Sequence, residues 1–258
     1  IALHFLPKSQ MTLSVYLINM DGATDRLAAM TEKLQAASLE YERVPGVNGR
    51  AITFPIKEFS ELSYKLLHGR RTTPAEVGCY LSHVDCARRL LAGHADLGLI
   101  LEDDVSFEPD FLNSVDCAAM HPTDWDILRL TTVNRGRKYP FKPLEDGRSL
   151  ALALTREKGA GAYVINREAA RWIVNRLIPM RLAYDIAFDL EYLDGLKAAF
   201  VDPQPASQYS EHETQIQSNM QQYKLPRWRY LTVLPYRAYL EVSRFFSRGF
   251  QLLRNRFF

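Results

Sequence analysis

Three consecutive acidic side chains are the most chemically distinctive feature of this sequence. Glu102, Asp103 and Asp104 directly follow the short apolar run 97–101, which predicts a buried strand. Open α/β sheets bind ligands beyond the carboxyl ends of their strands, and adjacent carboxylates repel one another unless a cation lies between them. Carboxylate oxygens suit a hard divalent cation, which can in turn hold a diphosphate. The alternative interpretation is a solvated acidic turn.

The surrounding sequence predicts alternating strands and helices. Apolar runs at 13–18 and 41–44 flank a helical pattern at 23–37, which is typical of a strand–helix–strand unit in a parallel sheet. The segment T-P-A-E (73–76) has the pattern of a capping box with proline at the first helical position, so a helix is expected to run from there to about Ala92. Further strands are expected at 97–101, 125–130, 150–154 and 162–165, followed by a helix at 167–177 that Asn166 caps. We therefore expect an α/β fold with a mostly parallel central sheet.

The bulk composition is that of a globular protein. Hydrophobic residues make up 47% of the 258 residues, which is enough to bury a large core. Cys79, Cys86 and Cys117 form no C-x-x-C pair and no disulfide pattern, so we expect buried thiols in a reducing compartment. Because no run of the sequence is long and apolar enough to span a bilayer, we expect a cytoplasmic location. Residues 1–10, which precede Met11, are interpreted as an upstream extension outside the fold.

Five ordered segments point to a known family. They are V-Y-L-I-N-M-D (15–21) with D-R-L (25–27), R-V-P-G-V-N-G (43–49), E-V-G-C-Y-L-S-H (76–83), I-L-E-D-D-V (100–105) and G-A-G-A-Y-V-I (159–165). In this order they resemble the family 25 glycosyltransferases, which include lipooligosaccharide galactosyltransferases and collagen galactosyltransferase domains. The resemblance covers residues 13–216 and implies a GT-A-like nucleotide-sugar-binding domain at 11–223. Gly22 and Ala183 depart from the pattern, because the family often has a basic residue and a proline there.

The resemblance also implies a reaction and a set of site residues. It implies inverting transfer of a hexose, with galactose as our choice, from a UDP-sugar to a lipid-linked or other glycan acceptor such as the lipopolysaccharide core. It implies Mn²⁺ or Mg²⁺ at the acidic triplet. From the residues themselves we expect Asp104 as the main ligand, Asp103 and His212 as further ligands, and Glu102 either orienting a sugar hydroxyl or supporting the metal ligands. The expected donor-binding residues are Asn19, Asp21, Arg26, Ser82, His83 and Asp103.

Several of these residues have a structural interpretation as well. Asp185 and Asp189 lie one helical turn apart, and either is a candidate for the general base that an inverting transfer requires. Each could instead be a structural acid near a helix N-terminus. Arg26 could be an exposed helix charge, His83 a core or supporting histidine, and His212 a solvated loop residue.

The last segment, 224–258, is basic and aromatic, with eight Lys or Arg residues against one acid. A helical stripe is predicted at Tyr239, Val242, Phe246, Phe250, Leu253 and Phe257, with Arg237, Arg244 and Arg248 on the opposite side. We expect residues 235–258 to bind an anionic membrane surface, which would place the protein peripherally on the inner face of the cytoplasmic membrane. The alternative is a helix that packs on the protein's own core with its arginines in water.

Two other functions share the acidic triplet. A nucleotidyltransferase also uses paired acids beside a parallel sheet, although the sequence has no G-x-x-x-x-G-K-[ST] phosphate loop. A non-catalytic glycan- or membrane-binding protein could use the same scaffold. Nucleic acid is not an expected partner, because the body is acidic and carries no recognition motif.

Overall fold

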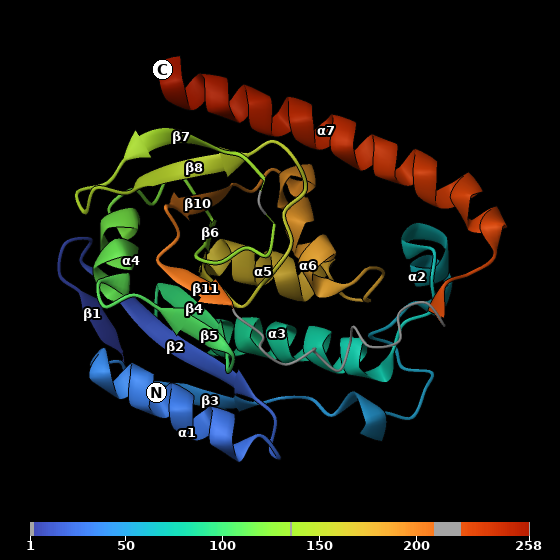
Figure 1. Ribbon diagram of the computed structural model, residues 1–258, viewed down its shortest axis with the longest axis horizontal. Coiled ribbons are helices and arrows are strands. Elements are labelled where there is room, and N and C mark those ends of the chain that lie inside the picture. Colours follow the sequence, from blue (N-terminus) through green and yellow to red (C-terminus); the bar gives the residue numbers. More distant parts are fainter. Residues whose placement is uncertain (1–2, 135, 209–222, 258) are drawn as a thin grey trace.

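The computed structural model describes residues 3–134, 136–208 and 223–257, and it has the expected α/β class (Figure 1). Within these ranges the strands are β1 (His4–Leu6), β2 (Met11–Asn19), β3 (Glu42–Pro45), β4 (Leu97–Glu102), β5 (Val105–Phe107), β6 (Ile127–Arg129), β7 (Lys138–Pro143), β8 (Ser149–Ala153), β9 (Ala162–Asn166), β10 (Ala198–Asp202) and β11 (Ala206–Gln208). The helices are α1 (Thr24–Ala36), α2 (Glu61–His68), α3 (Pro74–Ala92), α4 (Phe111–Ala119), α5 (Arg167–Arg176), α6 (Tyr184–Ala187) and α7 (Tyr230–Phe257). Short 3-10 helices lie at η1 (Gly49–Ala51), η2 (Phe188–Asp194) and η4 (Arg227–Arg229).

The central sheet is mixed, which corrects the prediction of a mostly parallel sheet. Its nine strands follow the order β1-β2-β4-β9-β6-β10-β8-β7, with β3 paired to β2. Strand β2 is parallel to β3 and β4, and β6 is parallel to β10, but β9 runs antiparallel between β4 and β6. The β7–β8 pair extends the far edge as another antiparallel ladder. An alternation of strands and helices along the chain does not specify the direction in which a later strand enters the sheet.

Residues 4–10 belong to the fold, although residues 1–10 were expected to lie outside it. Strand β1 pairs antiparallel with β2, and Leu6 is buried in the core. The backbone amides of Lys8 and Ser9 each donate a hydrogen bond of 3.0 Å to the Asp116 carboxylate of α4. A three-residue strand carries too little pattern to be recognised from sequence.

Helices cover both faces of the sheet and divide the core in two. Val15 and Leu17 of β2 lie in one apolar cluster with residues of α1 and α4. Tyr16 points to the opposite face and joins a second cluster with α3 and α5. This is the alternation expected of a strand that is buried on both sides.

Helix α3 carries much of the candidate site, and two local features fix its position. The predicted capping box is confirmed, because the Glu76 amide donates to the Thr73 hydroxyl at 3.2 Å and the Thr73 amide donates to the Glu76 carboxylate at 3.0 Å. Gly78 lets the helix touch the loop before η1, since a Cβ there would lie 2.2 Å from the Val47 carbonyl oxygen. The predicted Asn166 cap of α5 is also confirmed.

Helix α7 is the long C-terminal helix, and its buried side is not the predicted one. It crosses the molecule from α2 to the β7–β8 edge (Figure 1). Arg244 and Arg248 are buried against the body, whereas Phe246 and Phe250 are about 70% exposed. The prediction that these arginines face solvent is therefore wrong, and Leu240 and Leu252 lie on the same buried side of the helix. Among the described residues, no helix is both long and apolar enough to cross a bilayer.

Candidate active site

The acidic triplet lies at the carboxyl end of β4, as the sequence predicted. Glu102 is the last residue of the strand, and Asp103 and Asp104 form the turn into β5. The parallel neighbour β2 ends beside it, with Ile18 in register with Glu102. The turn after β2 and the triplet after β4 therefore meet at one edge of the sheet, where parallel strands place ligand-binding loops.

Asp103 joins these two turns. Its carboxylate accepts a hydrogen bond of 2.6 Å from the Asn19 side-chain amide and lies 3.2 Å from the guanidinium of Arg26. Arg43 of β3 donates to the Asn19 side chain at 3.0 Å and to the exposed Asp21 carboxylate at 2.7 Å. Four of the expected donor-binding residues, Asn19, Asp21, Arg26 and Asp103, thus belong to one polar cluster, in which the Arg26 side chain stays about half exposed.

Glu102 and Asp104 share a different partner. The Gln208 side-chain amide donates to Glu102 at 2.7 Å and to both Asp104 oxygens, at 3.0 and 3.3 Å. Gln208 reaches them because β11 pairs antiparallel with β5. Gly161, the residue before β9, leaves room for this side chain, since a Cβ at that position would lie 2.7 Å from the Gln208 amide oxygen.

The three carboxylates have different protonation behaviour. Burial, followed by repulsion from Glu102, raises the pKa of Asp104 to about 6. Burial also raises the pKa of Asp103, which the Asn19 hydrogen bond and Arg26 offset only in part. Burial acts in the same direction on Glu102, but the hydrogen bonds with His83 and Gln208 outweigh it and hold the pKa below its ordinary value. Asp104 is therefore the carboxylate that a bound cation would relieve most.

His83 and Ser82 lie next to each other on α3 but have different surroundings. His83 Nε2 lies 3.1 Å from a Glu102 oxygen, Nδ1 lies 3.0 Å from the Tyr163 hydroxyl, and the ring stacks on Tyr184 at 4.2 Å. The Ser82 hydroxyl instead donates to the Gly78 carbonyl and accepts from the Val47 amide, both at 2.9 Å. Ser82 thus fastens the loop before η1 to α3, while His83 is directed at the triplet.

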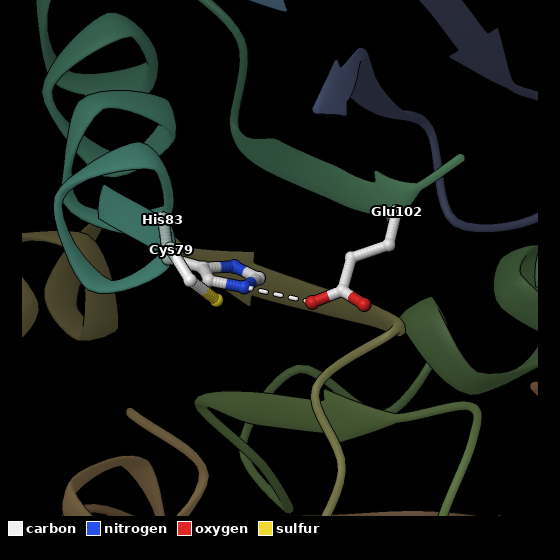
Figure 2. A group of neighbouring side chains, drawn as sticks. All are labelled: Cys79, His83 and Glu102. Atoms are coloured by element: carbon white, nitrogen blue, oxygen red, sulfur yellow. Dashed lines mark hydrogen bonds and ion pairs between the residues drawn. The ribbon is translucent and has the colours of Figure 1, made fainter. Parts of the chain in front are cut away.

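A third side chain of α3 faces the same place. Cys79 lies one helical turn before His83, and Figure 2 shows its sulfur directed toward the His83 ring and the Glu102 carboxylate. The ligand atoms of Cys79, His83 and Glu102 all lie within 4.8 Å of one another. The expectation that all three cysteines are buried is met at Cys86 and Cys117, whereas Cys79 is partly exposed.

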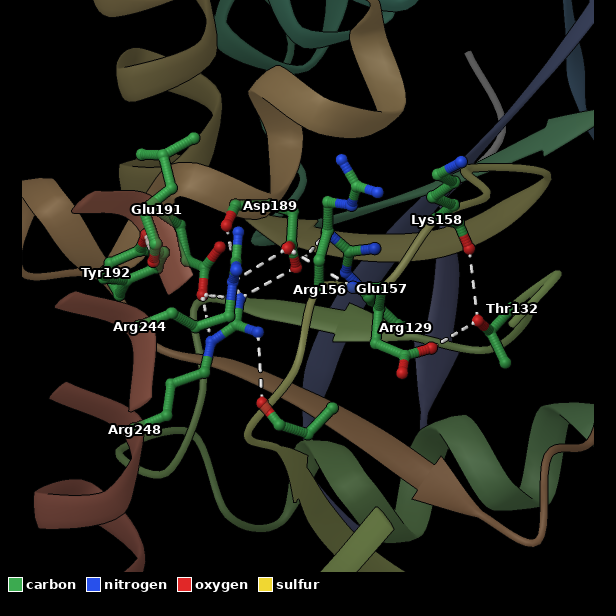
Figure 3. A network of polar contacts seen from close by, with 12 residues as sticks. Arg129, Thr132, Arg156, Glu157, Lys158, Asp189, Glu191, Tyr192, Arg244 and Arg248 are labelled. Carbon is green, nitrogen blue, oxygen red and sulfur yellow. Dashed lines mark hydrogen bonds and ion pairs between the residues drawn. The ribbon is translucent and has the colours of Figure 1, made fainter. Parts of the chain in front are cut away.

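The two candidate bases have unlike environments. Asp185, in the first turn of α6, is partly buried, and burial raises its pKa while the nearby positive charge of Lys158 lowers it in part. Asp189, in η2, is fully buried, and it lies 3.3, 3.1 and 2.9 Å from nitrogens of Arg129, Arg244 and Arg248 (Figure 3). Those contacts occupy both Asp189 oxygens and join η2 to α7.

One predicted residue cannot be placed, and three residues at the site were not predicted from the sequence. His212, an expected metal ligand, lies outside the described residues. No sequence motif marks Gln208 as a site residue, because its hydrogen-bond partners Glu102 and Asp104 lie about 100 residues away in the chain. Arg43 belongs to the family segment 43–49, but no role was predicted for it. Cys79 could have been found, since the i, i+4 spacing from His83 puts both side chains on one face of the helix.

Comparison with known sequences settles the family. The sequence profile of glycosyltransferase family 25, described as LPS biosynthesis protein, matches residues 12–188. The chain belongs to glycosyltransferase family 25. The match contains the triplet, the turn after β2, Cys79, His83 and Asp185, so the sequence resemblance is confirmed.

Curated proteins of this family and of the procollagen galactosyltransferases are similar to the chain at low sequence identity. A glycosyltransferase 25 family member of Anopheles gambiae is 28% identical over 203 residues, which is 71% of this chain and 33% of the relative. Procollagen galactosyltransferase 1-A of Xenopus laevis is 26% identical over 217 residues, which is 77% of this chain and 32% of the relative. The chain thus spans about a third of the length of these relatives. Among solved structures, S. aureus TarS 1-349 in complex with UDP-GlcNAc has a TM-score of 0.41 at 13% identity, over 85% of this chain and 64% of that chain, a weak likeness from which nothing further follows.

Proposed function

We propose that this family 25 chain transfers a hexose, with galactose as our choice, from a UDP-sugar to a glycan acceptor such as the lipopolysaccharide core, with inversion at the sugar carbon. The observation that carries the proposal is the meeting of three carboxylates at the end of β4 with Asn19 at the end of β2 and Arg26 of α1 at one sheet edge. Galactose is favoured because the Xenopus relative is named a galactosyltransferase. Membership of the family makes a nucleotide-sugar donor and a glycan acceptor the expected partners.

The donor set at the triplet fits Mn²⁺ or Mg²⁺. Both Asp104 oxygens accept from the Gln208 amide, and Glu102 offers a second carboxylate beside them. Asp103 is turned toward Asn19 and Arg26, so we assign it to positioning and keep Asp104 as the main ligand. A divalent cation held here would neutralise charge on the leaving diphosphate.

Two arginine side chains are proposed to complete the binding site for the sugar-nucleotide donor. Arg26 is half exposed beside the triplet and can pair with a phosphate oxygen when the donor binds. Arg43 holds Asn19 and Asp21 in place from the neighbouring strand. Positive charge beside the turn after β2 therefore comes from Arg26 of α1 and Arg43 of β3, although Gly22 in the turn itself stands where the family often has a basic residue.

Asp185 is the better of the two candidates for general base. Its raised pKa brings it closer to the working pH, which favours proton abstraction from an acceptor hydroxyl. Asp189 has no solvent exposure and is held by three arginines, so an acceptor hydroxyl has no path to it in this conformation. We therefore propose Asp185 as the base and Asp189 as a structural acid.

The exposed side of α7 is proposed to lie on an anionic membrane surface. Its apolar side chains Tyr239, Val242, Phe245, Phe246, Phe250 and Leu253 are all more than half exposed. Exposed Arg237, Arg254 and Arg256 on the same helix outnumber the exposed Glu241, so the charge complements acidic lipid headgroups. The chain would then be a peripheral protein on the inner face of the cytoplasmic membrane, close to a lipid-linked acceptor. Phe257 also belongs to the predicted stripe, but its side chain is not among those that the structure describes.

A donor screen tests the proposed function. Thermal unfolding is measured with UDP, UDP-galactose, UDP-glucose and other sugar nucleotides, each with and without Mn²⁺. Saturating donor should stabilise the fold by about 2–4 kcal/mol, and the effect should need the metal. Asp104→Asn is the matched variant and should lose the metal-dependent part. No stabilisation by any uridine nucleotide would argue against the proposal.

A further inference from the structure

Cys79, His83 and Glu102 form a ligand set whose chemistry differs from that of the acidic triplet. Cys79 and His83 come from one face of α3, and Glu102 comes from the end of β4 (Figure 2). One sulfur, one ring nitrogen and one carboxylate oxygen lie within 4.8 Å of one another. Tetrahedral zinc with bonds of about 2.0–2.3 Å needs ligand atoms roughly 3.3–3.8 Å apart, so only a small inward movement of these side chains is required.

We infer that these three residues bind a thiophilic divalent cation, Zn²⁺, at a second site that shares only Glu102 with the Mn²⁺ or Mg²⁺ site centred on Asp104. Sulfur and imidazole ligands select zinc, whereas oxygen-only sets select magnesium, calcium and manganese. A thiolate and a carboxylate together balance the charge of the ion. When the sulfur–zinc bond forms, the Cys79 thiol proton leaves to solvent and the ion stays Zn²⁺. Water takes the fourth position, as in other zinc sites with three protein ligands.

The surroundings already orient the imidazole for this role. His83 Nδ1 lies 3.0 Å from the Tyr163 hydroxyl, which lies 3.0 Å from the Tyr184 hydroxyl. The ring also stacks on Tyr184 with an interplanar angle of 5°. When zinc takes the place of the Nε2 proton that His83 shares with Glu102, the ring's single proton moves to Nδ1, where it can be donated to the Tyr163 hydroxyl, and the Nε2 lone pair is presented to the metal. A ligating histidine is usually held through its other nitrogen in this way.

Zinc at this site would act on the proposed transferase, and this part rests on the proposed function. Glu102 accepts a hydrogen bond from Gln208, and the same amide donates to Asp104. Coordination of Glu102 by zinc weakens the link to Gln208 and adds positive charge beside Asp104. Zinc is therefore expected to inhibit turnover in a manner that added Mn²⁺ does not fully reverse.

Cobalt serves as the spectroscopic probe for the binding claim. Co²⁺ added to the whole chain should produce a thiolate-to-cobalt charge-transfer band, and Zn²⁺ should displace it. Cys79→Ser should abolish the band and weaken Zn²⁺ binding at least about tenfold, measured by competition with a chromophoric chelator. Cys117→Ser, which removes a buried thiol bound by Lys8, is the matched control and should keep the band. Asp104→Asn should also keep it, since that residue belongs to the other site.

The outcomes separate this inference from the proposed function. A missing cobalt–thiolate band, or a band that survives in folded Cys79→Ser, overturns the zinc site whatever the enzyme does. Melting curves of each variant show whether it is folded. If the band behaves as expected but the chain releases no sugar from any UDP-hexose, the metal site stands and the proposed function fails. If Cys79→Ser is inhibited by zinc as strongly as the wild type, the inhibitory role is wrong.

Discussion

Glu102, Asp103 and Asp104 are adjacent in sequence but separate in role. Glu102 is held between His83 and Gln208, Asp103 ties two turns together through Asn19, and Asp104 is left with a shared amide and a raised pKa. Glu102 ends β4 while Asp103 and Asp104 lie in the turn that follows, so the three side chains reach different neighbours. The carboxylate with the weakest set of protein partners is the one that gains most from a cation.

Asp104→Asn is expected to separate folding from activity. A carboxyl group whose pKa is about 6 in the folded chain and about 3.9 unfolded destabilises the fold at neutral pH, because ionisation is favoured in the unfolded state. In EDTA at pH 7.5 the variant should therefore be as stable as the wild type or more stable, by roughly 1 kcal/mol after solvent screening. The difference should shrink as the pH falls below about 6 and vanish near pH 3 or below, where the acid is largely protonated in both states.

The same variant should lose metal-dependent transfer. In the wild type, Mn²⁺ affinity should fall as the pH drops through about 6, because protonation of Asp104 removes the ligand. Calorimetric Mn²⁺ titrations at several pH values check this dependence. A variant that is strongly destabilised, or a Mn²⁺ affinity that does not change with pH or with Asp104→Asn, would contradict the assignment.

Asp185→Asn and Asp189→Asn are expected to fail in different ways. Loss of a general base should lower the transfer rate by about 10²–10⁴ while donor binding survives, and we expect this for Asp185. Asp189→Asn should instead destabilise the fold by about 3–5 kcal/mol, because it leaves three buried arginines short of a counter-charge. Transfer rates and urea midpoints for both variants decide the matter. The reverse pattern would move the base to Asp189.

At the residue level, the sequence predicted the groups that lie close together in the chain or inside a recurring segment. The triplet, the Asn19 turn and His83 are of this kind. Gln208 could not be predicted, because it reaches the triplet only through the β5–β11 pairing. The sequence also could not show that Asp189 is buried in ion pairs while Asp185 is not, since the arginines that surround Asp189 come from the distant elements β6 and α7.

At the scale of elements, α7 shows how a helix can be predicted correctly and oriented incorrectly. The three-and-four spacing of apolar residues gives the helix, and it leads to the expectation that arginines face water. In the structure Arg248 pairs with Asp189 and with Glu191, at 2.9 and 2.6 Å, and Arg244 and Arg248 both lie over the Tyr192 ring (Figure 3). The counter-charges are more than 50 residues distant, so local pattern cannot reveal them.

The buried ion pairs are expected to hold α7 on the body. Arg248→Ala should destabilise the chain by about 3–5 kcal/mol, because Asp189 and Glu191 remain buried with less positive charge. Arg254→Ala, an exposed arginine on the same helix, is the matched control and should change stability by less than about 0.5 kcal/mol. Guanidinium unfolding curves measure both. Equal, small effects would mean that α7 is not anchored through these pairs.

The membrane proposal makes a prediction for the opposite side of the helix. Phe246→Ser combined with Phe250→Ser should strongly reduce co-sedimentation with phosphatidylglycerol vesicles at low salt without unfolding the chain, because both side chains are about 70% exposed. Leu62→Ser, equally exposed on α2, is the control and should bind as the wild type does. Point variants are preferable to truncation after Leu234, which would also remove the buried Arg244 and Arg248. No binding by the wild type, or equal binding by all three proteins, contradicts the proposal.

At the scale of the whole molecule, the candidate site is assembled at one edge of the sheet from segments spread over nearly 200 residues. The turn after β2, helix α3, the end of β4 and strand β11 each contribute one part. The fold class follows from the order of strands and helices, but the mixed direction of the sheet depends on where β9 is inserted. The central claim is that this edge binds a UDP-hexose together with a divalent metal and activates it for transfer.

Donor hydrolysis in the absence of acceptor tests that claim most directly. The full chain is incubated with UDP-galactose and Mn²⁺, and the products are separated by chromatography, with EDTA-treated protein and Asp104→Asn in parallel. The account predicts slow release of free galactose and UDP in equal amounts by the wild type with metal, and none by the other two. Release of a nucleoside monophosphate instead of UDP, or full activity in EDTA, would contradict it.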